Sequence, residues 1–275
     1  MILNKWTLRP KAVDRPTEIE DPAVIFIDYD GTELYTYSLD EANALTELPA
    51  NPTHDGLVAQ GWNWTLAQIK GQLLDTPETT IVVGQLYVTE SGATEIDIEL
   101  GDVWKSPYLT MGVNGTATID WGDNSTADIV TGTDLSSRKH TQHAYSNSGN
   151  YTIKITLNSG LARLIGRYPT AGSFFNNLSS SINYNDQYGY SVKSARFGNN
   201  MQCGDSTFYR CANLQYVTIS NSAITKDSYI FKQCYHLKSV TIPYDSSMTF
   251  GTQGFQNSFA LEYVSLPYGI TQIAD

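Results

Sequence analysis

Two short acidic stretches hold the residue types in this chain that most often carry chemistry. Asp28-Tyr29-Asp30-Gly31-Thr32 directly follows the apolar run Val24-Ile25-Phe26-Ile27, and Gly122-Asp123-Asn124-Ser125-Thr126-Ala127-Asp128 lies much further along. Clustered carboxylates can act as nucleophiles, general acids or metal ligands. The histidines are scattered, and none has a nucleophile and an acid at a readable spacing, so no catalytic residue is assigned.

The first acidic stretch, together with Asp123 and Asp128, resembles the motifs of haloacid dehalogenase-type phosphatases. That resemblance implies a nucleophile at Asp28 and a general acid at Asp30. Such sites lie at strand ends of a parallel sheet, whose strands are joined by long crossovers that are usually helical. The sequence between the two stretches predicts one convincing helix among turns and alternating strands. We therefore prefer a tight hairpin turn here, and keep the phosphatase as a remote alternative.

The composition indicates a β-rich, acidic protein of two or three domains. The chain has 275 residues, with 18 Tyr, 21 Gly and a net charge of −11. No basic patch is visible, which argues against a nucleic-acid partner. No apolar run approaches the roughly 20 residues that span a bilayer, so no membrane insertion is predicted. The N-terminus lacks a basic region followed by an apolar stretch, so a secretory signal is not expected in this chain.

The last third of the chain is repetitive, and the elements that would position a binding surface lie there. Three units with the pattern Phe-x-x-Cys-x-x-Leu-x-x-Val-x-Ile begin at Phe208, Phe231 and Phe255, although the third has Ser258 in place of Cys. A weaker copy, Val192-Lys193-Ser194-Ala195-Arg196-Phe197, aligns at an offset of 22 residues. A fixed period of this size predicts a solenoid of stacked units.

Each unit contains a short strand whose side chains alternate between the inside of the solenoid and the outside. The outward row combines tyrosines and hydroxyls with little charge, a composition that favours glycans or protein epitopes. The predicted ligand-binding residues are Arg196, Tyr216, Thr218, Ser239, Thr241, Tyr263 and Ser265.

Cys211 and Cys234 occupy the same position in successive units, which predicts a buried ladder of thiols. Adjacent rungs would lie about 4.8 Å apart, so a disulfide between them is geometrically conceivable. The third cysteine is Cys203. No CxxC or paired His spacing supports a metal site, and no cofactor is predicted.

The repeat pattern, with Pro243 and Pro267 after two of the strands, resembles the BspA-like leucine-rich repeat family of bacterial surfaces. This resemblance implies a non-enzymatic recognition or adhesion protein that contacts a cell-surface protein or glycan.

Residues 23–88 predict a small β-β-α-β module. Strands are expected at 24–27, 33–37 and 81–83, and helices at 39–48, with Ser38 as N-cap, and 65–74. Phe-x-Asp-Tyr-Asp-Gly-Thr and the later Leu-Pro-x-x-Pro pattern resemble the Listeria–Bacteroides repeat, a β-grasp-like spacer. Residues 1–22, with three prolines, predict an extended arm.

Residues 89–160 show strict two-residue alternation, which predicts a β-sandwich. Ile119-Asp120-Trp121-Gly122-Asp123, His143-Ala144-Tyr145 and Gly149-Asn150-Tyr151 resemble the polycystic-kidney-disease (PKD) domain, a rigid spacer. Asp120, Asp123 and Asp128 leave calcium binding open, although the preferred role of Asp123 is bracing its turn through backbone hydrogen bonds.

The expected architecture is therefore mainly β: a β-grasp-like module, a PKD-like sandwich, and leucine-rich repeats at 161–275. The repeats stop without an evident capping unit, which suggests a fragment or a homo-oligomer or assembly partner at that end. The expected location is extracellular, on a bacterial surface or a phage virion. The favoured role is recognition, including that of a phage-tail receptor-binding protein; the alternatives are a bacterial adhesin and a structural subunit.

Overall fold

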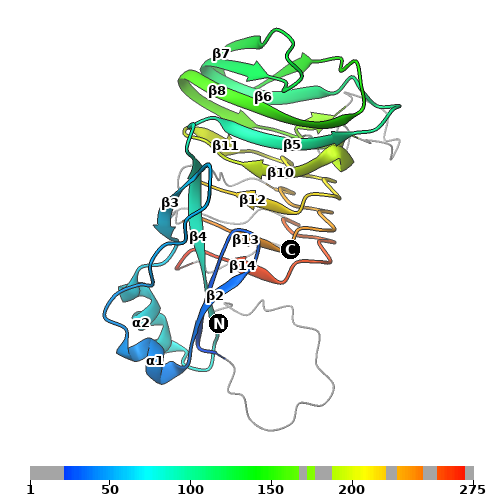
Figure 1. Ribbon diagram of the computed structural model, residues 1–275. Helices are drawn as coiled ribbons and strands as arrows, with labels where there is room; N and C mark the ends of the chain where they lie inside the picture. Colours follow the sequence, from blue (N-terminus) through cyan, green and yellow to red (C-terminus); the bar gives the residue numbers. More distant parts are fainter. Residues whose placement is uncertain (1–21, 167–171, 177–187, 221–227, 244–252, 270–275) are drawn as a thin grey trace.

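The computed structural model describes residues 22–166, 172–176, 188–220, 228–243 and 253–269, and these are mainly β-strands (Figure 1). Apart from Pro22, the predicted N-terminal arm lies outside the described residues. The chain forms an N-terminal module, a set of long strands, and a stack of short strands from the repeats. None of the described helices is long and apolar enough to cross a bilayer.

The N-terminal module is a four-stranded sheet with two helices packed on one face. Its elements are β1 (Val24–Ile27), β2 (Glu33–Tyr37), α1 (Leu39–Ala44), β3 (Leu57–Trp62), α2 (Leu66–Asp75) and β4 (Ile81–Thr89). The strand order is β2-β1-β4-β3, with β1 and β4 parallel at the centre and antiparallel strands at both edges. The predicted hairpin and both predicted helices are present, whereas β3 was not predicted.

Both helices begin at capping boxes. The Ser38 hydroxyl accepts from the Glu41 amide while the Glu41 carboxylate accepts from the Ser38 amide, which confirms the predicted N-cap. Thr65 and Gln68 make the same reciprocal pair at α2. Helix α1 ends earlier than predicted because Leu45 already has an extended backbone conformation.

The middle of the chain forms β5 (Thr94–Leu100), β6 (Tyr108–Asp120), β7 (Asp128–Gln142) and β8 (Gly149–Leu164). These strands belong to one continuous sheet with the order β12-β10-β5-β8-β6-β7. β8 pairs with β5 through its first half and with β11 at its end, and its pairing with β6 shifts register between Thr116 and Ala117. Strands that change partners at such irregularities form the corners of curved β structures. The predicted boundary at 160/161 falls within β8.

The predicted turn between two strands at 108–113 and 117–121 is absent, because β6 runs through it as a single strand. At Gly112 the backbone of β7 comes very close to β6, and a β-carbon on Gly112 would be 1.8 Å from the Leu135 carbonyl oxygen. β7 was not predicted because most of its side chains are polar and exposed on both faces. It is an edge strand held mainly by its backbone pairing to β6.

The repeats stack as successive rungs, made of β9 (Phe175–Asn176), a 3-10 turn at Gly189–Ser191, β10 (Val192–Arg196), β11 (Met201–Cys203), β12 (Tyr216–Thr218), β13 (Ser239–Thr241) and β14 (Tyr263–Ser265). The Phe208 and Phe231 rings stack at 5.5 Å, and the Phe231 and Phe255 rings stack at 5.6 Å. β10 pairs in parallel with β12 so that Ser194 faces Tyr216, which confirms the predicted 22-residue offset.

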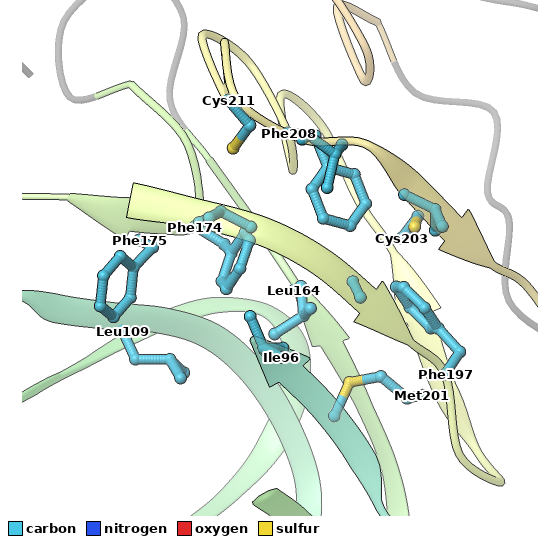
Figure 2. Close-up of a cluster of buried hydrophobic side chains, with 14 of the residues drawn as sticks. Ile96, Leu109, Leu164, Phe174, Phe175, Phe197, Met201, Cys203, Phe208 and Cys211 are labelled. Carbon is cyan, nitrogen blue, oxygen red and sulfur yellow. The ribbon is translucent and has the colours of Figure 1, made fainter. Parts of the chain in front are cut away.

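A single hydrophobic core runs from the long strands into the repeats (Figure 2). Phe174 lies near both sets, and its ring centroid is 5.6 Å from that of Phe208. Cys211 and Cys234 are buried, which confirms the predicted ladder, and both are free thiols, which answers the question of a disulfide that the sequence left open; Cys203 is also a buried free thiol. Burial raises the pKa of Cys234 well above its ordinary value, and its thiol donates to the Phe208 carbonyl at 3.1 Å. Ser258 makes the equivalent hydrogen bond to Phe231 at 2.7 Å, so serine replaces cysteine without losing the contact.

Candidate functional site: the strand face of the repeats

The candidate site is the face formed by β10, β12, β13 and β14, on which the predicted ligand-binding residues lie. β13 and β14 pair so that Ser239 faces Tyr263 and Thr241 faces Ser265. The repeat register therefore brings equivalent side chains into rows, as the sequence predicted. We call this surface the strand face.

The strand face is covered by the N-terminal module. Thr218, Ser239, Thr241, Tyr263 and Ser265 are each at most 6% exposed. Tyr216 is partly exposed, and its ring lies 5.0 Å from that of Tyr29 in the turn after β1. The covering elements are β1 and β4, whose other face packs against the helices. The predicted ligand contacts thus face an internal partner in this structure.

Asn63, just before α2, is the centre of the polar contact. Its side-chain amide donates to the carbonyls of Ile242 and Ser265 at 2.9 and 3.2 Å, while its own oxygen accepts from the Gly84 amide at 3.0 Å and lies 3.0 Å from the Ser265 hydroxyl, whose single proton can instead go to the Val82 carbonyl. Trp64 donates its indole N–H to the Leu266 carbonyl at 2.6 Å. One buried amide therefore joins β4 to the last two rungs, with its donor and acceptor groups satisfied.

Two serine hydroxyls of the strand face bind backbone carbonyls of the module. Ser265 donates to the Val82 carbonyl at 2.7 Å, and Ser239 donates to the Tyr29 carbonyl at 2.9 Å. Gly84 allows the closest approach, because a β-carbon there would lie 2.0 Å from the Thr241 hydroxyl oxygen. The apolar part of the contact is smaller.

That apolar part has two small groups of side chains. Ile25 and Ile27 of β1 form a cluster with Tyr263, and Val82 packs against it. The Trp64 and Tyr268 rings meet edge to face at 5.3 Å. The hydroxyl of Tyr263 also donates to the Glu33 carboxylate. The strand face is thus held by a mixture of hydrogen bonds and a limited apolar contact.

Arg196, the remaining predicted ligand contact, is bound to acidic residues of β5. Its guanidinium lies 3.1 Å from the Glu95 carboxylate and 3.2 Å from that of Asp97. Ser194 on the same strand donates to Asp97 at 2.6 Å. In this structure the arginine joins the first rung to the long strands.

Asp28 is buried at the end of β1. Its carboxylate accepts from the Tyr87 hydroxyl at 2.7 Å and lies 2.7 Å from the His54 ring nitrogen. Burial, together with the hydrogen bond to Asp28, raises the pKa of Tyr87. Asp30 instead accepts from the Thr32 amide at 2.9 Å, which is the contact expected of a turn residue. This geometry favours the turn interpretation of the first acidic stretch.

The carboxylates considered for calcium are engaged within their own turn. Asp120 accepts from the Gly122 amide at 2.9 Å, and Asp128 accepts from the Trp121 indole at 2.8 Å. Burial acts to raise the pKa of Asp123, but hydrogen bonds from Ser125 and from the His143 ring outweigh it, so the pKa is lowered. Among the described residues there is no group of three or more His, Cys, Asp or Glu side chains placed to hold a metal ion.

Sequence reasoning missed a second row of side chains, which we call the aromatic column. The strand registers place Tyr190, Ala212, Tyr235 and Phe259 at the same position of successive rungs. The Tyr235 and Phe259 rings stack at 5.7 Å, and Phe259 is 79% exposed. Tyr190 is 37% exposed. The recurring aromatic residue directly after the Cys or Ser position was the available signal.

Comparison with known protein families gives one match. Residues 172–275 match the family model described as BspA type leucine rich repeat region (6 copies), a repeat family of surface and adhesion proteins. The C-terminal part of the chain is therefore similar to BspA-type leucine-rich repeats, and the matched range begins upstream of the three clear units. Searches of curated proteins and of solved structures returned no match to this chain.

Proposed function

We propose that this chain is a non-enzymatic recognition protein whose leucine-rich-repeat solenoid contacts a cell-surface protein or glycan. The observation that carries the proposal is the BspA-type match over residues 172–275, where equivalent side chains lie in rows. A rigid row at fixed spacing gives contact area at little entropic cost. Within the described repeats, the aromatic column is exposed at Tyr190 and Phe259, unlike the covered strand face.

The other two parts serve as spacers in this proposal. The β2-β1-β4-β3 order of the N-terminal module supports the β-grasp-like interpretation. Trp121 stacks on His143 at 4.7 Å and accepts a hydrogen bond from Tyr145 at its carbonyl, so the PKD-like motifs contact one another. These contacts support a PKD-like spacer.

The aromatic column can be tested with the full chain on arrays of bacterial glycans and of surface-protein fractions. Phe259→Ala and Tyr235→Ala should each weaken binding about tenfold or more, in the range of an interface hot spot. Ile129→Ala is the matched control, because Ile129 is 71% exposed on β7, outside the repeats. Binding that is unchanged in both column variants would refute the column as the contact surface.

The finer proposal is a receptor-binding protein of a phage or prophage tail, with a bacterial adhesin and a structural subunit as alternatives. Tail genes beside the coding sequence would support the first, and cell-wall genes would support the second. Copurification with fixed protein partners, without glycan binding, would support the third. The partner proposed at the C-terminal end would contact the rung of β14. Residues 270–275, which follow this rung, lie outside the described residues.

A further inference from the structure

The contact between the strand face and the N-terminal module resembles the way in which a protein surface binds an extended polypeptide. β4 lies against β10, β12, β13 and β14, and runs alongside the stacked rungs (Figure 1). The hydroxyls of Ser265 and Ser239 bind backbone carbonyls of the module, at Val82 and Tyr29. Contacts to backbone atoms hold an extended chain, and the close approach of Gly84 to Thr241 makes the fit depend on which residue lies at that position.

The same contact leaves polar groups unsatisfied. Five buried side-chain polar atoms in the described part of the chain have no hydrogen-bond partner. Three of them, Arg196 Nε, Thr218 Oγ1 and Thr241 Oγ1, belong to the strand face. Each such group costs about 1–3 kcal/mol when buried unpaired. These groups would regain partners if the face were open to water or to another chain.

The connection between the module and the rest of the chain is short and single. Among the described residues, the chain passes from the module to β5 only once, through the turn from Thr89 to Ala93. Gly92 in this turn has a φ of 71° and donates its amide to Thr89. A module joined by one short turn, through a partly polar contact, is expected to move relative to its neighbour.

We propose that the strand face is a binding surface for an extended polypeptide strand, and that the N-terminal module is a detachable cover whose β4 occupies it. Six of the seven predicted ligand contacts, all except Arg196, then act when the cover is released. This inference deepens the proposed recognition role by naming the class of partner and the control of access. The opening itself is measurable without any ligand.

Opening is tested by thiol labelling of the full-length Thr241→Cys protein under native conditions, with each cysteine followed by peptide mass spectrometry. The native Cys211 and Cys234 are internal controls, because both are fully buried in the core of the repeats. The introduced thiol should react at least tenfold faster than these two. Equal rates would mean that the module leaves only when the repeats unfold, and would overturn the proposal. Thr218→Cys is the second reporter if the first variant does not fold.

A locked variant provides the control for opening. A β-carbon at Gly31 would lie 3.2 Å from the Ser239 β-carbon, slightly closer than the roughly 3.5–4.5 Å of a disulfide. Gly31→Cys with Ser239→Cys can therefore form a cross-link between module and strand face if the turn relaxes, because the φ of 88° at Gly31 strains any side chain there. Oxidation of this pair should slow labelling of the introduced thiol at 241 to the rate of the native cysteines. If the thiol at position 241 is still labelled fast in the locked protein, release of the module cannot be the cause of its labelling.

The partner class is tested with a fluorescent peptide that has the sequence of residues 79–91, which includes β4. Anisotropy should show binding to the full-length Asn63→Ala protein, in which the two hydrogen bonds from the Asn63 side chain to the carbonyls of Ile242 and Ser265 are lost. Binding should be at least tenfold weaker to the locked variant, and a scrambled peptide should not bind. If the module opens but no peptide binds in a sequence-dependent way, the assignment of a polypeptide partner is overturned. If no cell-surface ligand is found, the proposed function is refuted, but the labelling result still stands.

Discussion

Replacing Gly84 with alanine is the smallest change that separates the cover from the strand face. The added β-carbon would lie 2.0, 2.5 and 2.7 Å from the Oγ1, Cγ2 and Cβ atoms of Thr241. Carbon contacts are favourable at about 3.5–4.0 Å, so β4 or β13 must move by about an ångström or more. Overpacking of this kind costs about 1–3 kcal/mol. Alanine regains about 0.5–1 kcal/mol over glycine in a strand, which leaves an expected net loss of about 1–2 kcal/mol.

The loss should appear in urea denaturation as a lower midpoint, and in thiol labelling as faster opening. Gly101→Ala is the matched control, because a β-carbon at Gly101 meets nothing within 4 Å. That variant should stay within about 0.5 kcal/mol of the wild type. Combining Gly84→Ala with Thr241→Ala removes the two contacts beyond the β-carbon and should restore part of the loss, which a double-mutant cycle measures. A Gly84→Ala protein as stable as the Gly101→Ala protein would refute the close approach of β4 to β13.

Three further predictions concern the repeats and the long strands. Phe231→Ala should lower the free energy of unfolding by about 3–5 kcal/mol, because its fully buried ring stacks on both sides. The control Phe259→Ala, at an exposed ring, should cost less than about 0.5 kcal/mol. Equal losses in the two variants would count against the stacked Phe rings as a source of stability. Ser258→Cys should be nearly neutral, since Cys234 makes the same contact. Ser258→Ala should lose about 0.5–1.5 kcal/mol, because the Phe231 carbonyl then keeps only its 3.4 Å hydrogen bond from the Cys234 amide; the opposite order would contradict this. The lowered pKa of Asp123 stabilises the fold above the unfolded-state pKa of about 3.9, and this contribution is lost as the pH falls through the folded-state value. Urea titrations from pH 6 to pH 2 should therefore show a smaller acid loss for Asp123→Asn, and parallel curves would exclude the role of this carboxylate.

The period of the repeats made their stacking predictable, because a solenoid register follows from residue spacing. The Phe column, the thiol positions and the 22-residue offset of the first copy all agree with that spacing. The backbone conformation of the corners was not predictable. Arg210, Gln233 and Asn257 share a φ of 62–63° at one position of each unit, although none of them is glycine. Hydrogen bonds between rungs impose this conformation, and residue type does not reveal it.

The covering of the strand face was also beyond sequence reasoning. The sequence predicts that Thr218, Thr241 and Ser265 point outward from the rung, but an outward side chain can face either solvent or another module. β1 carried the missing information: Val24-Ile25-Phe26-Ile27 is apolar at every position and all four residues are buried, so the strand is covered on both faces. A continuous apolar run in the N-terminal module was the signal that its sheet needs a second layer.

Oxidation of the Gly31→Cys, Ser239→Cys protein tests most directly whether the module sits on the repeats. Because the two β-carbons would lie 3.2 Å apart, a disulfide should form within the monomer once the strained turn at Gly31 moves by a few tenths of an ångström. Mass spectrometry would then find the two cysteine-containing peptides joined, with Cys203, Cys211 and Cys234 unmodified. Recovery of both introduced cysteines as reactive thiols, in a protein that is otherwise folded, would contradict the covered strand face.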